Sequence, residues 1–142
     1  MQISSFTDYS IRVLMHLATL PPGELTRIRY VSELYDISRN HLVKIVHRLG
    51  QLGYIETVQG KNGGFRLNAA AENIFLGELF QNLESMQLID CSPSFCHISK
   101  VCRLRTYFAD SRAAFLKELN KYSIQDLILE NPELGNALKK QN

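Results

Sequence analysis

Three cysteines are the residues in this chain whose type and spacing are best suited to chemistry. Cys91, Cys96 and Cys102 lie within twelve residues, in the pattern C-x4-C-x5-C. An odd number of cysteines cannot pair fully within one chain, and close clustering is typical of metal or redox sites rather than of structural disulfides. Thiolates are the usual ligands of iron–sulfur clusters and of structural zinc. The sequence therefore predicts a metal centre on this segment.

The spacing of the cysteines favours an iron–sulfur cluster over zinc. Structural zinc sites usually take pairs of cysteines only two residues apart, whereas gaps of four and five residues fit a larger cluster. A zinc site stays open, because His97 next to Cys96 would complete a Cys3His set. For a cluster, Asp8 and Asp90 are candidate oxygen donors for the fourth position. Three inert, buried thiols would explain the clustering poorly.

A second group of residues has the charge expected of a nucleic-acid-binding surface. The whole chain has a net charge of only +2, but residues 37–67 contain an excess of four positive charges. Such a local basic segment in a nearly neutral protein is typical of nucleic-acid binding, although a solvated helix face can also be basic. The charged residues of this segment are Arg39, Lys44, Arg48, Lys61 and Arg66, against Glu56.

The basic segment coincides with a predicted helix-turn-helix. Residues 30–35 have the pattern of a two-turn helix, and Ser38 is a strong N-cap candidate for the next one. Residues 39–52 then combine an apolar stripe with a polar, basic face, and Gly53 stands where a helix often ends. A short helix, a tight turn and a longer helix with a basic face are typical of DNA-binding helix-turn-helix proteins.

A predicted β-hairpin follows directly. Residues 54–58 alternate and are rich in strand-forming side chains, residues 59–64 are rich in glycine, and residues 65–67 resume a strand pattern. A helix-turn-helix followed by such a hairpin is a winged helix. We expect a mainly α fold with a small β-hairpin, in which a winged helix-turn-helix is joined to a long C-terminal dimerisation helix.

Further helices are predicted on both sides of the winged helix. Residues 9–20 form an amphipathic helix for which Thr7 or Asp8 would be the N-cap, and residues 74–83 form another. Residues 102–122 form a long helix that has no obvious globular layer to pack against, so a second copy of the chain is its expected partner. Ser123 would cap a short helix that ends at residue 129.

These elements suggest three functional parts. Residues 1–72 would be the DNA-binding domain, residues 73–101 a helix and cluster-binding loop, and residues 102–142 the dimerisation helix with a fraying tail. The loop over residues 85–101 has no sustained periodicity, and loops of that length are usually functional or disordered.

The expected DNA contacts come from the start of the second helix and from the wing. Arginine can pair with guanine and asparagine with adenine in the major groove, and glycines let backbone N–H groups approach phosphates. The candidate DNA-binding residues are Ser38, Arg39, Asn40, His41, Lys44, Arg48, Lys61, Asn62, Gly63 and Gly64.

Other classes of protein are disfavoured. No run approaches the roughly 20 apolar residues of a membrane helix, and the first ten residues lack the features of a signal peptide, so we expect a cytoplasmic protein. No catalytic triad, phosphate-binding loop or paired acidic dyad is recognisable, so we do not expect an enzyme.

Four segments in the same order carry a resemblance to a known family. They are FTDYSIRVLMHLA, ISRNHLVKIVHRLGQLGYI, GKNGGFRL and DCSPSFCHISKVCRL, and together they span nearly the whole chain. The chain resembles the winged-helix iron–sulfur repressors that include IscR and NsrR. The gap of four residues between the first two cysteines makes it most similar to the nitric-oxide-sensing NsrR branch.

The resemblance implies a homodimer crossed by long helices. It implies a [4Fe–4S] cluster on Cys91, Cys96 and Cys102, with a [2Fe–2S] form also possible, and Asp8 of the other subunit as fourth ligand. It further implies binding to double-stranded operator DNA, nitric oxide as the signal and control of nitric oxide detoxification genes. The alternatives are an IscR-like regulator that senses cluster supply or redox state, and a zinc-bearing DNA-binding protein.

Overall fold

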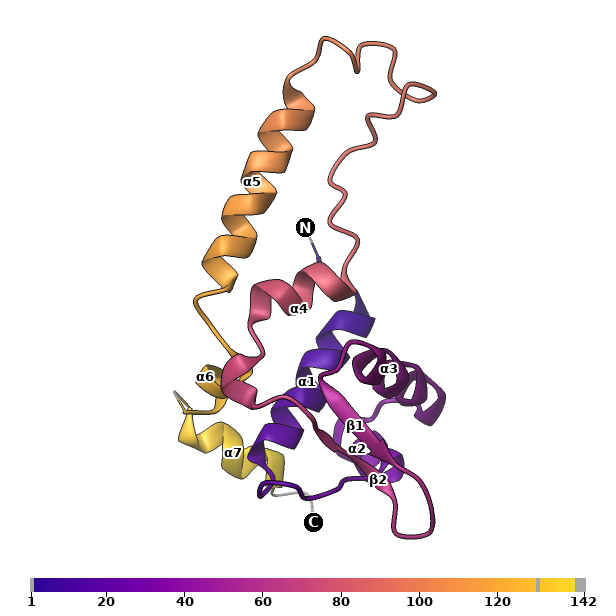
Figure 1. Ribbon diagram of the computed structural model, residues 1–142, viewed down its shortest axis with the longest axis vertical. Coiled ribbons are helices and arrows are strands. Elements are labelled where there is room, and N and C mark those ends of the chain that lie inside the picture. Colours follow the sequence, from indigo (N-terminus) through magenta and orange to yellow (C-terminus); the bar gives the residue numbers. More distant parts are fainter. Residues whose placement is uncertain (1, 130, 140–142) are drawn as a thin grey trace.

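The computed structural model describes residues 2–129 and 131–139, which form a compact body and a projecting arm. The arm consists of one long helix and the cysteine-containing loop at its far end (Figure 1). The elements in chain order are α1 (Ser5–Thr19), α2 (Ile28–Tyr35), α3 (Arg39–Gln51), β1 (Ile55–Val58), β2 (Gly64–Leu67), the 3-10 turn η1 (Ala71–Asn73), α4 (Leu76–Leu83), α5 (Leu104–Leu119), α6 (Ile124–Leu129) and α7 (Pro132–Lys139). The predicted fold class, mainly helical with a small hairpin, is confirmed.

The body is built around the predicted helix-turn-helix. The hydroxyl of Ser38 accepts a hydrogen bond from the backbone N–H of His41, so Ser38 caps α3 as expected. The apolar stripe of α3 faces α1 and α2, and β1 also packs against α3. The buried apolar side chains of this core are Val13, Leu14, Leu17, Val31, Ile37, Leu42, Ile45, Val46, Leu49, Ile55, Phe65, Ala71, Ile74, Leu79 and Ile124.

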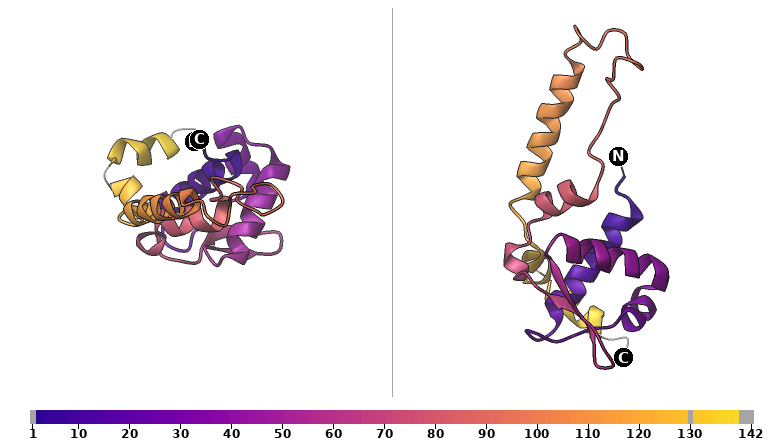
Figure 2. Two further views of the ribbon diagram at one scale, coloured as in Figure 1. Left: turned by 90° about the horizontal axis from the view of Figure 1, so that it is seen from above. Right: turned by 45° about the vertical axis from the view of Figure 1, so that its right-hand side comes forward.

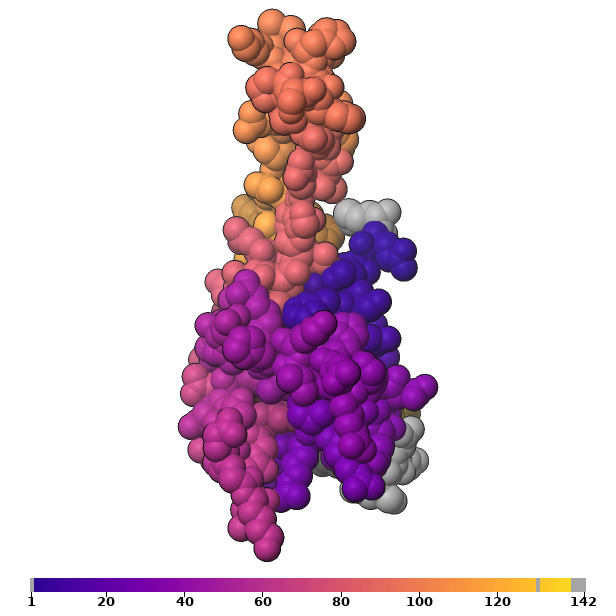
Figure 3. All heavy atoms as spheres, turned by 90° about the vertical axis from the view of Figure 1, so that its right-hand side faces the viewer, coloured from indigo at the N-terminus to yellow at the C-terminus, as the bar shows by residue number. Residues whose placement is uncertain are grey.

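The wing is an antiparallel hairpin of β1 and β2, in which Ile55 pairs with Leu67 and Val58 with Gly64. An additional bridge between Thr26 and Phe65 fastens β2 to the segment before α2. Phe65 is buried and anchors the hairpin to the core. Figure 3 shows the tip of the wing projecting from the body, at the opposite end of the molecule from the cysteine loop.

The start of α1 differs from the prediction. The helix begins at Ser5, and Ser4 caps it by accepting a hydrogen bond from the N–H of Thr7. Thr7 and Asp8 therefore lie within the first turn, and neither is the N-cap. The acidic residue still suits its place, because a negative charge in the first turn of a helix interacts favourably with the helix dipole.

Helix α5 packs on the body only at its C-terminal half. A side chain at Gly77 of α4 would collide with the carbonyl of Leu116 and the side chain of Asn120, so glycine permits this close approach. Phe80 and Phe115 meet edge to face, with 6.2 Å between ring centroids. The prediction that this helix lacks a globular layer was thus wrong for its C-terminal half. The helix is also shorter than the predicted range of 102–122.

Two helices complete the body after α5. Ser123 and Asp126 cap α6 reciprocally, because the N–H of Asp126 bonds the hydroxyl of Ser123 and the Asp126 carboxylate accepts from the N–H of Ser123. Helix α7 was not predicted, although Asn131 and Pro132 form a recognisable start signal. Of the predicted fraying tail, residues 140–142 lie outside the described residues. Within the described ranges, no helix is long and apolar enough to span a bilayer.

Candidate DNA-binding surface and cysteine loop

The N-terminal half of α3 presents a basic, exposed edge. Arg39, Asn40 and Lys44 are exposed. Among the described residues, Arg39 and Lys44 take part in no ion pair, so both charges are available to a polyanion. The N-terminal residues of a recognition helix are the ones that reach base edges in the major groove. The structure therefore places these three predicted residues where DNA contact is possible.

Two other predicted DNA contacts are engaged with the protein itself. His41 is half-buried, and its ring packs against the rings of Phe6 and Tyr9 of α1, at 6.1 and 5.3 Å between centroids. Arg48 donates a hydrogen bond to the backbone carbonyl of Asn82 at the end of α4, at 3.3 Å. The sequence pattern of α3 did not predict these contacts. Both residues lie at the border of the apolar stripe, where the pattern does not distinguish a solvent-exposed side chain from one that contacts a neighbouring helix.

At the wing, Lys61 and Asn62 are exposed at the tip. Sequence reasoning missed Arg27, which precedes α2 and donates a hydrogen bond to the carbonyl of Lys61 at 3.2 Å. Gly63 and Gly64 are required by packing, since a side chain on either would collide with backbone of the protein, at Val58 and Thr26 respectively. Packing within the protein is therefore a reason for glycine at both positions, in addition to the expected approach of their backbone N–H groups to DNA phosphates.

The cysteine loop connects α4 to α5 and lies at the far end of the arm (Figure 2). All three cysteines are free thiols, and each is half-buried. Short turns shape the loop: the N–H of Cys96 bonds the carbonyl of Ser92 at 2.9 Å, and the N–H of Cys102 bonds that of Ile98 at 3.0 Å. None of the three thiols is paired in a disulfide, and all are within reach of solvent, as ligands must be before they bind a metal.

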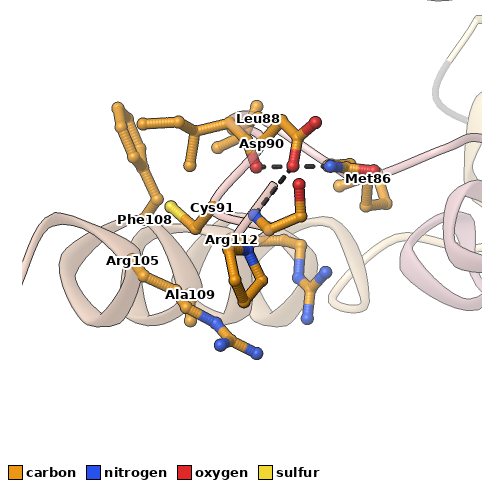
Figure 4. Close-up of a pocket in the computed structure, with 12 residues that line it drawn as sticks. Met86, Leu88, Asp90, Cys91, Arg105, Phe108, Ala109 and Arg112 are labelled. Carbon is orange, nitrogen blue, oxygen red and sulfur yellow. Dashed lines mark hydrogen bonds between the residues drawn. The ribbon is translucent and has the colours of Figure 1, made fainter. Parts of the chain in front are cut away.

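A cavity of about 570 Å³ lies between the start of this loop and α5. Figure 4 shows Cys91 on the loop side, facing a wall that contains Arg105, Phe108 and Arg112. Arg105 and Arg112 line the same cavity as Cys91 and add positive charge to its wall. Their spacing of seven residues along one helix was a signal that sequence reasoning missed.

Two of the other candidate ligands, Cys102 and Asp90, are held by local hydrogen bonds. The sulfur of Cys102 accepts a hydrogen bond from the N–H of Leu104 at 3.4 Å, where α5 begins. Hydrogen bonds from Ser92 hold the pKa of Asp90 below its ordinary value, so this carboxylate is ionised and already engaged.

The single chain does not bring the predicted ligands together. Among residues 2–129 and 131–139, no three His, Cys, Asp or Glu side chains are close enough to hold a metal ion. Asp8 is instead in a two-point ion pair with Arg12, with N–O distances of 3.0 and 3.1 Å. The donor set itself fits an iron–sulfur cluster, since it offers three thiols on one loop, none of them paired in a disulfide. Binding would require the loop to close.

Comparison with known proteins places the chain in a family. The model of the Rrf2 family, described as iron-dependent transcriptional regulators, matches residues 3–130. The chain belongs to the Rrf2 family. It is therefore a DNA-binding transcription regulator and not an enzyme. Members of the family commonly dimerise, and IscR-like members can bind iron–sulfur clusters.

Solved structures of other regulators share the fold. IscR from T. potens is 17% identical and has a TM-score of 0.72, covering 94% of this chain and 90% of its own. CymR, the global cysteine regulator of B. subtilis, is 20% identical with a TM-score of 0.69, covering 89% and 95%. The oxidised form of Staphylococcus aureus CymR is 24% identical, also with a TM-score of 0.69 and the same coverage. At these identities the similarity shows the fold alone.

Proposed function

We propose that this Rrf2 regulator is a repressor that responds to nitric oxide through an iron–sulfur cluster on Cys91, Cys96 and Cys102. The observation that carries the proposal is the set of three free thiols on one loop, in a chain whose recognition helix presents an exposed basic edge. The C-x4-C spacing and the resemblance to NsrR favour nitric oxide as the signal and its detoxification genes as the targets. A [4Fe–4S] cluster is favoured, with [2Fe–2S] as the other form.

A bound cluster would supply iron that reacts with nitric oxide. The protein would contribute three thiolates from one loop and the carboxylate of Asp8 from a second subunit. A carboxylate is a harder and more labile ligand than a thiolate on iron. The exposed Asp8–Arg12 ion pair is worth at most about 1 kcal/mol, so Asp8 can leave Arg12 at little cost.

Operator DNA would be bound by the two winged helices of a homodimer. The start of α3 would enter the major groove, with Ser38, Arg39, Asn40 and Lys44. The wing would approach the DNA backbone, with Lys61, Asn62, Gly63 and Gly64. Arg48 and His41 remain part of the proposed surface, although both contact the protein in this structure. Such a repressor acts where the chromosome is, so a cytoplasmic location belongs to the same proposal.

The homodimer would form along α5. No residue of this helix is fully buried, and Leu104 and Tyr107 are exposed in its N-terminal half, beyond the contact with α4. A second copy would cover this apolar surface and place each cysteine loop near the other subunit's α1. We propose the same functional division as from the sequence, 1–72 for DNA, 73–101 for the cluster and 102–142 for dimerisation, with α6 and α7 of the third part packed on α1.

The test is anaerobic purification followed by iron and sulfide analysis. We expect iron and sulfide in similar amounts for the wild type and for Ser94→Ala, which alters the same loop but leaves every thiol in place. Cys96→Ser should lose both iron and sulfide, and with them tight operator binding. Zinc without sulfide, or a Cys96→Ser protein that binds the operator as tightly as the loaded wild type, would refute the proposal. An IscR-like regulator would hold the cluster but would not respond selectively to nitric oxide.

A further inference from the structure

The first turn of α1 lies between the cysteine loop and the recognition helix. In Figures 1 and 2 the N-terminal end of α1 points toward the arm, and α3 packs beside α1 in the body. The same turn contains Asp8, the proposed ligand for a second copy. A displacement at the loop could therefore reach α3 through this turn, if contacts join it to both sides.

On the loop side, the contact is a pair of hydrogen bonds between Ser4 and Glu84. The backbone N–H and the hydroxyl of Ser4 both donate to Glu84 Oε1, at 2.6 and 2.8 Å. Such charge-assisted bonds are short and comparatively strong. Glu84 immediately follows α4, and the cysteine loop begins at the next residue. The base of the loop is thus attached directly to the start of α1.

On the DNA side, the contact is aromatic. The rings of Phe6 and Tyr9 pack against His41, which lies in the first turn of α3 beside Asn40. Tyr9 meets the imidazole edge to face at an interplanar angle of 73°, a geometry that aromatic pairs prefer. The position of the first turn of α3 is therefore set by the first turn of α1.

Between these two contacts the turn is rigid. Thr7 and Ser10 are fully buried, and the hydroxyl of Ser10 donates to the carbonyl of Phe6 at 2.7 Å. Val13 and Leu14, in the next turn, are also fully buried. Close-packed elements transmit a displacement rather than absorb it.

We propose that the first turn of α1 is the mechanical joint of the regulator, with Glu84 and His41 as its two positioning residues. Movement of the loop base is transmitted through Ser4 to the turn, and through Phe6 and Tyr9 to His41 and the start of the recognition helix. In this joint His41 acts by orienting Arg39 and Asn40, a role separate from its place on the proposed DNA-binding surface. This inference rests on the proposed function, because it requires the cluster state to change operator affinity.

The experiment measures operator affinity in the cluster-loaded and cluster-free states and takes the ratio of the two dissociation constants. The DNA is a duplex selected from random sequence with the loaded wild type. Iron and sulfide are quantified in every sample. For the wild type we expect a ratio of about tenfold or more, in the usual range of allosteric coupling. Glu84→Ala and His41→Ala should each lower the ratio to below about threefold with unchanged cluster content.

Two further variants test the joint itself. His41→Phe retains a ring against Phe6 and Tyr9 and should restore a ratio near that of the wild type. The double variant of Glu84→Ala and His41→Ala should behave like either single variant, because both interrupt one path. Glu84 is half-buried but lies outside the apolar core, so its replacement leaves the core intact.

Three results would overturn the joint. Glu84→Ala could leave the ratio unchanged. His41→Ala could weaken both states by the same factor, which is the signature of a direct DNA contact. Alternatively, the effects of the two variants could be additive. A wild-type ratio of one, or a protein without iron, would instead refute the proposed function, so the two failures are distinguishable.

Discussion

The packing of α5 on α4 predicts that Gly77→Ala destabilises the protein, although alanine is the better helix former. Gly77 lies inside α4, and a methyl group there would collide with the backbone carbonyl of Leu116 and with the side chain of Asn120. Asn120 is itself needed, because its side-chain oxygen accepts a hydrogen bond from the N–H of Glu78 at 2.9 Å. The Leu116 carbonyl cannot move without disrupting α5, and the Asn120 side chain cannot move without losing its hydrogen bond from Glu78.

The magnitude follows from three opposing contributions. Forcing an extra methyl group into a close contact costs about 1–3 kcal/mol. Loss of the hydrogen bond from Glu78 to Asn120 costs about 1 kcal/mol more, whereas the higher helix propensity of alanine recovers about 1 kcal/mol. The net expectation is a loss of about 1–3 kcal/mol in the free energy of unfolding, or a fall in Tm of about 3–12 °C for a chain of this size.

The assay is urea unfolding at a fixed protein concentration, with Gly135→Ala as the matched control. Gly135 lies in α7, and a side chain there would meet nothing within 4 Å. The control should therefore be unchanged or more stable by up to about 1 kcal/mol. A Gly77→Ala protein that is as stable as the wild type, with α5 still docked, would refute the reasoning about this contact.

Three further predictions concern charge. Burial lowers the pKa of His16, so the folded protein keeps this side chain neutral while the unfolded chain takes up a proton below the ordinary pKa of 6.5. The free energy of unfolding should therefore fall as pH drops below that value, by at most about 1.4 kcal/mol per pH unit. Urea unfolding of His16→Phe should show a weaker dependence of stability on pH. Lys61→Ala should weaken binding to all DNA sequences. In a salt titration, it should lower the magnitude of the slope of log association constant against log salt concentration by about one, whereas Lys121→Ala should leave that slope unchanged. Asp8→Asn should change the free energy of unfolding by less than about 1 kcal/mol, since its ion pair with Arg12 is exposed, yet it should speed cluster loss measured by absorbance; an unchanged rate would exclude Asp8 as a ligand.

The fold was largely predictable because its signals are local. Ser38, the apolar stripe of α3 and the glycine-rich turn of the wing each determine structure through neighbours close in sequence. Helix α7 was missed although Asn131 and Pro132 mark its start. The start of α1 was misplaced because several residues near it can cap a helix, and tertiary contacts of Ser4 with Glu84 decide between them.

The site was less predictable because its contacts join distant parts of the chain. Periodicity places His41 on the polar side of α3, but its contact with Tyr9 depends on how α1 crosses α3. Arg105 and Cys91 line one cavity only because the loop folds back along α5. The spacing of the cysteines identifies the ligands, whereas their assembly depends on loop closure and on a second subunit, which no local pattern contains.

The central claim, that a cluster on the cysteine loop controls DNA binding, is tested most directly by an anaerobic titration. Nitric oxide is added to the cluster-loaded wild type on a fluorescent operator duplex, while DNA anisotropy and cluster absorbance are followed together. We predict that the DNA is released in step with the loss of the cluster absorbance. Loss of that absorbance while the operator stays bound with unchanged affinity would contradict the account.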